Sequence, residues 1–422
     1  MSVHPLLKRL GLREATALVI SNVVGTGIFT VPGIVAGLVP NAAAVLALWA
    51  FGGVLALCGA LSYGALAARY PRAGGEYVYL REGIGPVAGF LSGWTSFIAG
   101  FSGSVAAGAM AVVAYLGFPM LDFRGRAIAC AIIVAFAALH SFRLALGAQV
   151  QSVVTLLNVG LFVLLCVGGL LTSAKPVAAP AGTFGFSTLL VALVPIMFTY
   201  SGWNAAAYVA EEVQSPEKNV RRSLLIGTGV VIVLYLLVNV VYVLKVGIGA
   251  DTGIDIAAVI GQRTFGSVGE HVVRVFSIVI ITASVSAMTI AGPRVYFAMA
   301  RDGCFPRWVV SLDPKTHVPH AAIWLQAFWS CLLVLSGTFE EVLLYTGFAV
   351  VLFSTGAVVT LVWTRGAASA GVLVAAVAFT VAGVGMLTSV LIRAPKPSLI
   401  GVALIAAGLP VYWWTARRRS AA

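Results

Sequence analysis

The feature that most constrains this chain is a series of apolar runs that recurs from one end to the other. A transmembrane helix needs roughly 20 predominantly apolar residues, and each run reaches about that length. The pattern therefore predicts an all-α polytopic membrane protein with about 12 transmembrane helices. The runs lie near residues 14–38, 41–68, 85–117, 125–142, 148–172, 187–211, 223–246, 270–300, 319–337, 341–364, 367–391 and 398–415.

The composition supports this reading. The 422 residues are 60% hydrophobic and only 9% charged, whereas about a quarter of the residues of a soluble domain are charged. No segment between the apolar runs is long enough to form a soluble domain. We therefore expect a single membrane transport domain over residues 1–422. The first run is longer than the apolar part of a signal peptide, so we expect it to stay in the mature protein.

The charge distribution predicts an orientation. Lys and Arg favour short cytoplasmic loops, and here they gather at the ends of alternate spans, among them Arg69, Arg72, Arg221 and Arg222. This places both termini in the cytoplasm of a multi-pass protein of the plasma (inner) membrane. The net charge of +12 is then explained by topology. Nucleic-acid binding is not expected, because the basic residues are scattered rather than gathered into one stripe.

The first span contains an anomaly, the stretch SNVVGTGIFTVPG from Ser21 to Gly33. Glycine costs up to about 1 kcal/mol relative to alanine inside a helix. A dinucleotide-binding loop would need a third glycine at Thr30 and a strand before it, and a packing groove would favour a GxxxG spacing. Neither fits well, so we favour a break in the helix at Gly25 to Gly27.

A second span is interrupted in a similar way. Residues 187–211 include Pro195, a Ser201-Gly202 pair and Asn204. Each interruption opens a set of five spans, which is the arrangement of transporters built from inverted repeats. We expect repeat one at about 14–172, repeat two at about 187–364, and two extra helices at about 367–415.

Broken helices would supply a binding site from backbone groups. The half-helix beginning near Thr26 would present free N–H groups and a partial positive charge of about half a unit to a carboxylate. Carbonyl groups left free at Val23 and from Phe198 to Ser201 would accept hydrogen bonds from an ammonium group. A carboxylate and an ammonium one carbon apart define an α-amino acid.

Several motifs in order along the chain carry a family resemblance. They are GTGIF in span 1, YPRAGGEYVYL after span 2, FTYSGWN in span 6, EEVQSPEKNVRRSLLIG after it, and GPRVYFAMARDG at the end of span 8. The chain resembles permeases of the amino acid/polyamine/organocation (APC) superfamily, and among them bacterial proteins similar to L-type amino acid transporters. The resemblance covers nearly the whole chain and implies a LeuT-like 5+5 inverted repeat.

The resemblance also implies roles for individual residues. The backbone amides of Gly25, Thr26 and Gly27 would bind the substrate carboxylate, and the carbonyls of Val23, Phe198 and Ser201 would bind the ammonium. Phe198 matches an aromatic that closes over the substrate as a gate. Asn204 would brace the unwound backbone of span 6.

The coupling mechanism stays open at this stage. Some relatives carry a lysine in span 5 where this chain has Asn158, which cannot titrate. Sequence places none of the acidic residues in the middle third of a span, and this favours exchange or facilitated flux over a proton relay. Ser284 and Thr289 of span 8 are candidates for a sodium site. Ser286 and Thr289 of span 8 and Ser102 of span 3 are candidates for the side-chain pocket, although helix packing is the more common role of such residues.

These observations converge on the transport of neutral L-amino acids by alternating access. A charged substrate would require a counter-charge in the pocket, and spans 1, 3, 6, 8 and 10 offer none. The alternatives are a proton- or sodium-coupled symporter or exporter, and then a carrier of polyamines or other amines. An enzyme is not expected, since no catalytic constellation is visible. No metal or other cofactor is expected, and the partners are the lipid bilayer, the substrate and a counter-substrate amino acid, H⁺ or Na⁺.

Overall fold

The computed structural model describes residues 6–25, 27–120, 122–142, 144–171, 183–248, 256–336, 339–364, 368–393 and 395–420. Its regular elements are helices throughout the described part of the chain. In chain order they are α1 (Leu12–Val23), α2 (Gly27–Leu38), α3 (Ala42–Arg69), α4 (Glu76–Gly83), α5 (Pro86–Thr95), a π-helical turn η1 (Ser96–Gly100), α6 (Phe101–Tyr115), α7 (Phe123–Phe142), α8 (Leu144–Leu171), α9 (Phe186–Tyr200), α10 (Ala205–Tyr208), η2 (Ala210–Glu212), α11 (Pro216–Lys245), α12 (Ile256–Phe265), α13 (Ser267–Arg301), η3 (Arg307–Val310), α14 (His320–Ser336), α15 (Phe339–Thr364), α16 (Ala370–Arg393), α17 (Pro395–Ala406) and α18 (Gly408–Ser420).

These helices confirm the predicted fold class, an all-α polytopic membrane protein. Within the described residues, nine stretches are long and apolar enough to cross a membrane, and α1 with α2 forms a tenth, bent by 44°. The shorter apolar helices α9 and α14 coincide with the two remaining predicted spans. The boundaries of the two repeats stay a prediction.

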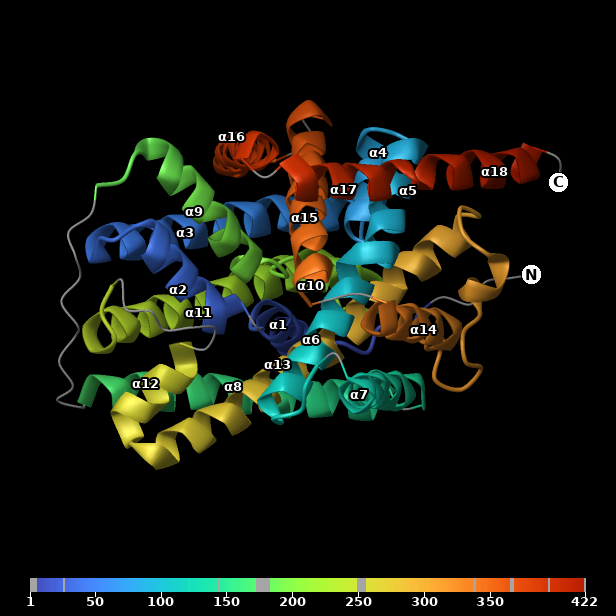
Figure 1. The fold of residues 1–422 in the computed structure, drawn as a ribbon. Coiled ribbons are helices and arrows are strands. Elements are labelled where there is room, and N and C mark those ends of the chain that lie inside the picture. The colour runs from blue at the N-terminus through green and yellow to red at the C-terminus, as the bar shows by residue number, and fades with distance from the viewer. Residues whose placement is uncertain are drawn as a thin grey trace.

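The two interrupted spans lie at the centre of the bundle (Figure 1). The chain enters through α1, which packs against α8, α11 and α13, and α10 lies beside it. Helix α1 starts, and helix α18 ends, at the same end of the molecule (Figure 1). The loops 70–75, 209–215 and 302–319 belong to this end, which we call the terminal face.

The local geometry explains why each interrupted helix stops. Backbone dihedrals leave the helical region at Val24 (ψ 99°), where α1 ends, and at Ser201 (ψ 153°), where α9 ends. Gly202 has a φ of +97°, which other residues rarely adopt. The two breaks also touch, because Asn22 Nδ2 donates a 3.3 Å hydrogen bond to the Gly202 carbonyl.

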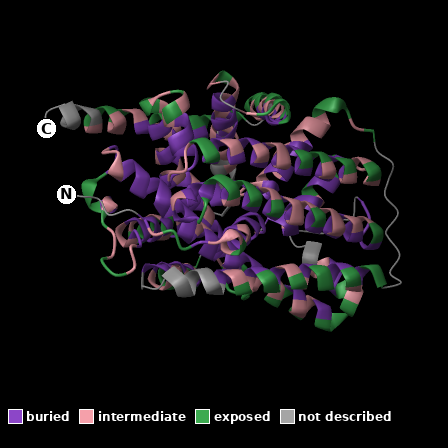
Figure 2. Ribbon diagram, turned by 180° about the vertical axis from the view of Figure 1, so that it is seen from behind, coloured by how far each residue is buried: buried purple, intermediate pink, exposed green. Residues whose placement is uncertain are grey.

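The core around the breaks is aromatic and closely packed. The rings of Trp49, Tyr200 and Tyr235 contact one another with centroids 5.1 to 5.9 Å apart, and all three side chains are buried. Small residues let the helices approach, as expected in membranes: a Cβ at Gly59 would lie 2.6 Å from the Trp203 ring. Buried residues run through the middle of the bundle, while exposed ones follow its outer helix faces (Figure 2).

Candidate functional site

A cavity lies where the two interrupted spans meet. Its lining comes from the end of α1 (Asn22 and Val23), from the start of α2, from the end of α9 and from helices α6 and α13. The cavity encloses about 520 Å³ of empty space, part of it open to solvent. The described lining residues carry no charge: Asn22, Val23, Gly25, Gly27, Ser104, Ala107, Gly108, Phe198, Thr199, Ser201, Ile281, Ser284 and Met288.

The start of α2 brings backbone donors to this cavity. Helix α2 begins at Gly27, and the first N–H groups of a helix have no partner within it. A Cβ at Gly27 would lie 2.8 Å from Thr199 Oγ1 and 3.2 Å from Thr199 Cα, so only glycine fits here without a shift. Gly25 also lines the cavity, and Thr26 lies outside the described residues.

The backbone carbonyls of the site are partly engaged by the protein itself. The Val23 carbonyl accepts a 2.9 Å hydrogen bond from the Tyr235 hydroxyl, which also lies 3.3 Å from the Thr199 carbonyl. The Phe198 carbonyl accepts from the Ser201 N–H at 2.9 Å. A carbonyl oxygen has two lone pairs, so the Val23 and Phe198 carbonyls keep capacity for a further donor.

Tyr235 was not among the residues singled out from the sequence. It stands in the middle of the apolar helix α11 and is fully buried. The only signal available was its hydroxyl, because a buried Tyr O–H usually finds a hydrogen-bond partner. Sequence alone does not say that this partner lies in the other interrupted helices.

Of the remaining predicted site residues, some line the cavity and others form hydrogen bonds elsewhere. Phe198 lines the cavity, and its ring lies 3.4 Å from a Cβ built on Gly347 of α15. Ser284 lines it as well, with its Oγ 3.3 Å from a Cβ built on Gly25. Ser286 instead bonds His140 at 2.9 Å, and Thr289 bonds the carbonyl of its own helix at Val285 at 2.8 Å.

Asn158 is placed differently again. Its side chain is 1% exposed, and within the described part of the chain neither its amide nitrogen nor its amide oxygen has a hydrogen-bond partner. It does not line the cavity between the breaks. From the sequence, the Asn158 amide could hydrogen-bond the Gly25 region, but no such bond is present among the described residues.

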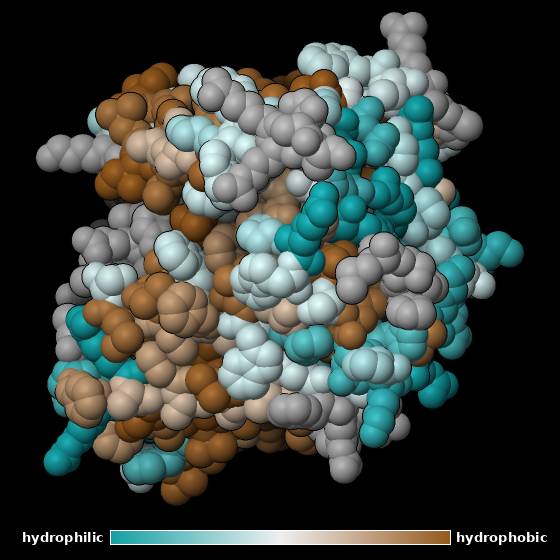
Figure 3. Space-filling model, turned by 90° about the vertical axis from the view of Figure 1, so that its right-hand side faces the viewer, coloured by the Kyte–Doolittle hydropathy of each residue, from teal (hydrophilic) through white to brown (hydrophobic). Residues whose placement is uncertain are grey.

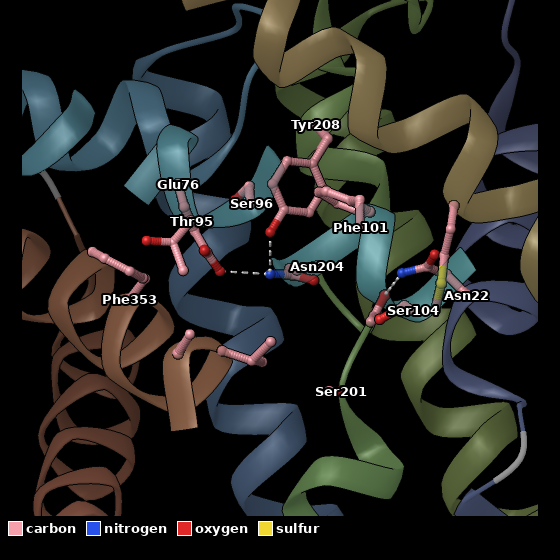
Figure 4. A pocket seen from close by; sticks show the side chains of 15 residues that line it. Asn22, Glu76, Thr95, Ser96, Phe101, Ser104, Ser201, Asn204, Tyr208 and Phe353 are labelled. Carbon is pink, nitrogen blue, oxygen red and sulfur yellow. Dashed lines mark hydrogen bonds between the residues drawn. The ribbon is translucent and has the colours of Figure 1, made fainter. Parts of the chain in front are cut away.

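A second cavity adjoins the first and shares Asn22, Ser104, Ser201 and Met288 with it. It encloses about 580 Å³ of empty space, part of it open to solvent, and is lined by Glu76 and Asn204. Asn204 Nδ2 donates to Glu76 Oε1 at 2.8 Å and to the Tyr208 hydroxyl at 3.0 Å (Figure 4). The sequence predicted that Asn204 braces the unwound backbone of span 6, whereas these two contacts of its amide are with the side chains of Glu76 and Tyr208.

Glu76 is the second residue that sequence reasoning missed as a lining group. It starts α4, outside the spans, and is only 5% exposed. Burial raises the pKa of its carboxyl to about 7, although hydrogen bonds from Tyr63, Tyr208 and Asn204 act in the opposite direction. A titratable group therefore lies beside the interrupted spans.

Ion pairs join the helices at the terminal face. The Glu212 carboxylate pairs with Arg294 at 2.6 Å, and both side chains are 1% exposed. Glu211 pairs with Arg301 at 2.9 Å, and Asp302 with Arg72 at 3.0 Å and with Arg81. The sequence suggested an inner gate in which Arg72 or Glu76 forms salt bridges with the charged group Glu211, Glu212, Lys218, Arg221 and Arg222. Among the described residues, Arg72 pairs instead with Glu82 and Asp302, and no ion pair includes Glu76. Figure 3 looks onto this end of the molecule, where hydrophilic residues gather over part of the surface.

Backbone hydrogen bonds also join two segments at the terminal face. Leu10 N–H donates to the Glu212 carbonyl, and Gln214 N–H donates to the Leu10 carbonyl, both at 2.9 Å. These two bonds tie the segment before α1 to the segment after α10. Among the described residues, no group of three or more His, Cys, Asp or Glu could hold a metal ion.

Comparison with known proteins agrees with this architecture. The chain matches the family model described as amino acid permease over residues 10–415. It is 27% identical to the serine/threonine exchanger SteT of Bacillus subtilis over 341 residues, covering 78% of this chain and 77% of that protein. It is 26% identical to the human b(0,+)-type amino acid transporter 1 over 361 residues, covering 82% and 74%.

A third relative is an uncharacterized transporter of Mycobacterium tuberculosis, which is 30% identical over 330 residues, covering 75% of this chain and 71% of that protein. The family match extends over nearly all the helices that form the two cavities. It confirms the resemblance to the APC superfamily and identifies a transporter rather than an enzyme. The chain belongs to the amino acid permease family.

Proposed function

We propose that this protein moves neutral L-amino acids across the membrane by alternating access, as an exchanger or facilitator. The observation that carries the proposal is the uncharged cavity between the two interrupted spans. It combines the N-terminus of α2 at Gly27 with the carbonyls at Val23 and Phe198. These are the complements of a carboxylate and an ammonium group.

The lining supports a neutral side chain. A charged substrate side chain would lose its hydration in the cavity without a partner of opposite charge, which is costly. Met288, Ile281 and Ala107 supply apolar surface, while Ser104 and Ser284 supply hydroxyl groups. Small apolar and hydroxyl side chains suit this lining, and the serine/threonine exchanger of Bacillus subtilis is one of the relatives.

Three features of the site support the proposal of alternating access. The cavity lies between helices whose ends meet at their breaks, and ion pairs hold the terminal face together. Phe198 lies at the cavity beside α15, where its ring would close over a bound substrate. Rearrangement of these contacts around a fixed site would expose the substrate to each side in turn.

The test is reconstitution of the purified full-length protein into liposomes. We expect uptake of labelled serine, threonine, alanine or leucine to require an internal neutral amino acid, or to equilibrate without one. Lysine and glutamate should not compete. Uptake that occurs only with a pH or sodium gradient would contradict the exchanger or facilitator, and no uptake under any condition would overturn the transport of amino acids.

A variant of Gly27 tests the carboxylate site. In Gly27→Ala the new Cβ would collide with Thr199 and move the first N–H groups of α2. Losing one hydrogen bond to a charged group costs about 1.5–3 kcal/mol, so we expect KM to rise about tenfold or more.

Gly37→Ala is the matched control, because it lies in the same helix and a Cβ there meets nothing within 4 Å. We expect its KM to equal that of the unmodified protein. An unchanged KM in Gly27→Ala would refute the proposed carboxylate site.

A further inference from the structure

Glu76 is a buried carboxyl group whose hydrogen-bond partners among the described residues are uncharged. Its Oε1 accepts hydrogen bonds from the Tyr63 hydroxyl at 2.7 Å and from Asn204 Nδ2 at 2.8 Å. Among the described residues, no ion pair includes it, whereas Glu211 and Glu212 each pair with an arginine. Burying a carboxylate without a cation costs free energy, so the presence of Glu76 at the cavity requires a reason.

The contacts of Glu76 connect it to the interrupted span. Asn204 follows the break at Ser201 and Gly202, and its second amide hydrogen bonds Tyr208. The start of α4 is attached to the same segment, since Gly74 N–H donates to the Tyr208 carbonyl at 3.0 Å. Figure 4 shows Glu76, Asn204 and Tyr208 pointing toward one another from these elements. The carboxyl group thus joins α3 and α4 to the segment that must move in alternating access.

The protonation state of Glu76 changes the strength of this junction. A hydrogen bond to an ionised acceptor is roughly twice as strong as one between neutral groups. The carboxylate therefore holds Asn204 and Tyr63 more firmly than the protonated carboxyl does. Burial places the pKa of Glu76 at about 7, so both forms are populated near neutral pH.

From this geometry we propose that Glu76 is a proton-binding site of the transport cycle. The carboxylate holds the Asn204 segment in place. Once the carboxylate has taken up a proton from the aqueous solution that reaches this cavity, the neutral carboxyl group releases the Asn204 segment. Proton binding then favours opening of the cavity toward the terminal face. The inference rests on the proposed transport function and assigns Glu76 as a positioning residue that acts through Asn204.

Among the groups around Glu76, only its own carboxyl is expected to change protonation state near neutral pH. Tyrosines face it from α3 (Tyr63), α4 (Tyr79) and α10 (Tyr208), and tyrosine ordinarily titrates near pH 10. The cavity residues contributed by α5, η1, α6, α13 and α15 are uncharged. The charged side chains of α13 at this end, Arg294 and Arg301, are paired with Glu212 and Glu211, and Arg81 of α4 is paired with Asp302.

The experiment compares exchange rates in proteoliposomes at equal internal and external pH. The pH is varied from about 5.5 to about 8.5, so that it passes through the raised pKa of Glu76. The labelled substrate is serine, with serine inside. For the unmodified protein we expect the exchange rate to rise about tenfold as the pH falls, because protonation of Glu76 weakens the hydrogen bonds to its carboxylate. The midpoint of this rise should lie near pH 7. Glu76→Gln resembles the protonated form and should be fast throughout the range.

Two further variants separate this role from a merely structural one. Tyr63→Phe removes a donor that favours the carboxylate, so the pKa rises and the midpoint should move to higher pH. Glu217→Gln changes an exposed glutamate at the start of α11 and should keep the unmodified profile. Equal pH profiles for the unmodified protein and Glu76→Gln, or an unshifted midpoint in Tyr63→Phe, would overturn the role of Glu76. Absence of flux at every pH would instead overturn the proposed transport function.

Discussion

At the scale of single residues, Tyr235 shows how one side chain can connect both interrupted spans. Its hydroxyl donates to the Val23 carbonyl of α1 and lies within reach of the Thr199 carbonyl of α9. A hydroxyl has a single proton, so it can serve only one of the two carbonyls at a time. Through the shorter of these contacts, the side chain of Tyr235 fixes the position of the Val23 carbonyl, which we assign to the substrate ammonium group.

Replacing Tyr235 by phenylalanine should affect substrate binding more than folding. The ring contacts with Trp49 and Tyr200 would remain, while the donor to Val23 would be lost. Leaving a buried acceptor without its partner costs about 1–3 kcal/mol. We expect KM to rise about fivefold or more, measured as substrate exchange in proteoliposomes.

Tyr200→Phe is the matched control. It also removes a buried hydroxyl, but that hydroxyl donates to the Trp49 carbonyl at 3.2 Å, and Trp49, unlike Val23, does not line the cavity. We expect its KM to stay close to the original value. Equal changes in KM for the two variants would show that Tyr235 acts through general packing.

At the scale of elements, the terminal face is held by contacts between α13 and the segment that follows α10. Arg294 donates from Nε and Nη2 to the two oxygens of Glu212, at 2.6 and 3.0 Å, and from Nη1 to the Ile290 carbonyl. This is the two-pronged geometry in which Arg binds carboxylate best. Because the pair is buried, removing one partner leaves an unpaired charge that costs about 3–5 kcal/mol.

This pair can be tested by a double-mutant cycle. We expect Glu212→Gln and Arg294→Met each to lower the melting temperature of the detergent-purified protein and to reduce exchange. The double variant should be less destabilised than the sum of the two single variants, since residues in direct contact are not additive.

A cycle at Glu270 and Arg274 provides the comparison, because that ion pair is exposed on α13 and surface pairs contribute about 0–1 kcal/mol. If the effects at Glu212 and Arg294 were additive, the pair would not act as a unit that holds this face.

At the scale of the whole molecule, the sequence predicts most of the fold because crossing a membrane imposes a length and an apolarity on every span. The interruptions at Gly25 to Gly27 and at Ser201 and Gly202 are also visible, since each breaks the local helical pattern. The structure places Val23, Gly25, Gly27, Phe198 and Ser201 at one cavity, as such a pattern suggests.

What the sequence could not supply is the set of neighbours across helices. Hydrophobicity gives the depth of a residue along a span but does not say which other helix it faces. The sequence therefore suggested Glu76 only as a possible member of an inner gate, and it did not single out Tyr235. The pairing of Glu211 with Arg301 and of Glu212 with Arg294 was missed for the same reason, because the partners lie about 80 to 90 residues away in the sequence.

The orientation in the membrane is the remaining prediction at this scale. The bias of Lys and Arg toward the terminal face predicts that this face, with both termini, lies in the cytoplasm. The prediction can be tested with single cysteines at Lys315 and Phe118, which are exposed residues in the loops 302–319 and 116–122. The five native cysteines are first replaced by alanine, and transport by this background is checked.

In intact cells a membrane-impermeant maleimide should label Phe118→Cys and leave Lys315→Cys unlabelled until the cells are opened. Labelling of Lys315→Cys in intact cells would reverse the orientation. The protons that we assign to Glu76 would then enter from the opposite side, because the cavity lined by Glu76 adjoins the segment that leads to the terminal face. The labelling pattern therefore decides whether cytoplasmic or external pH controls the step at Glu76.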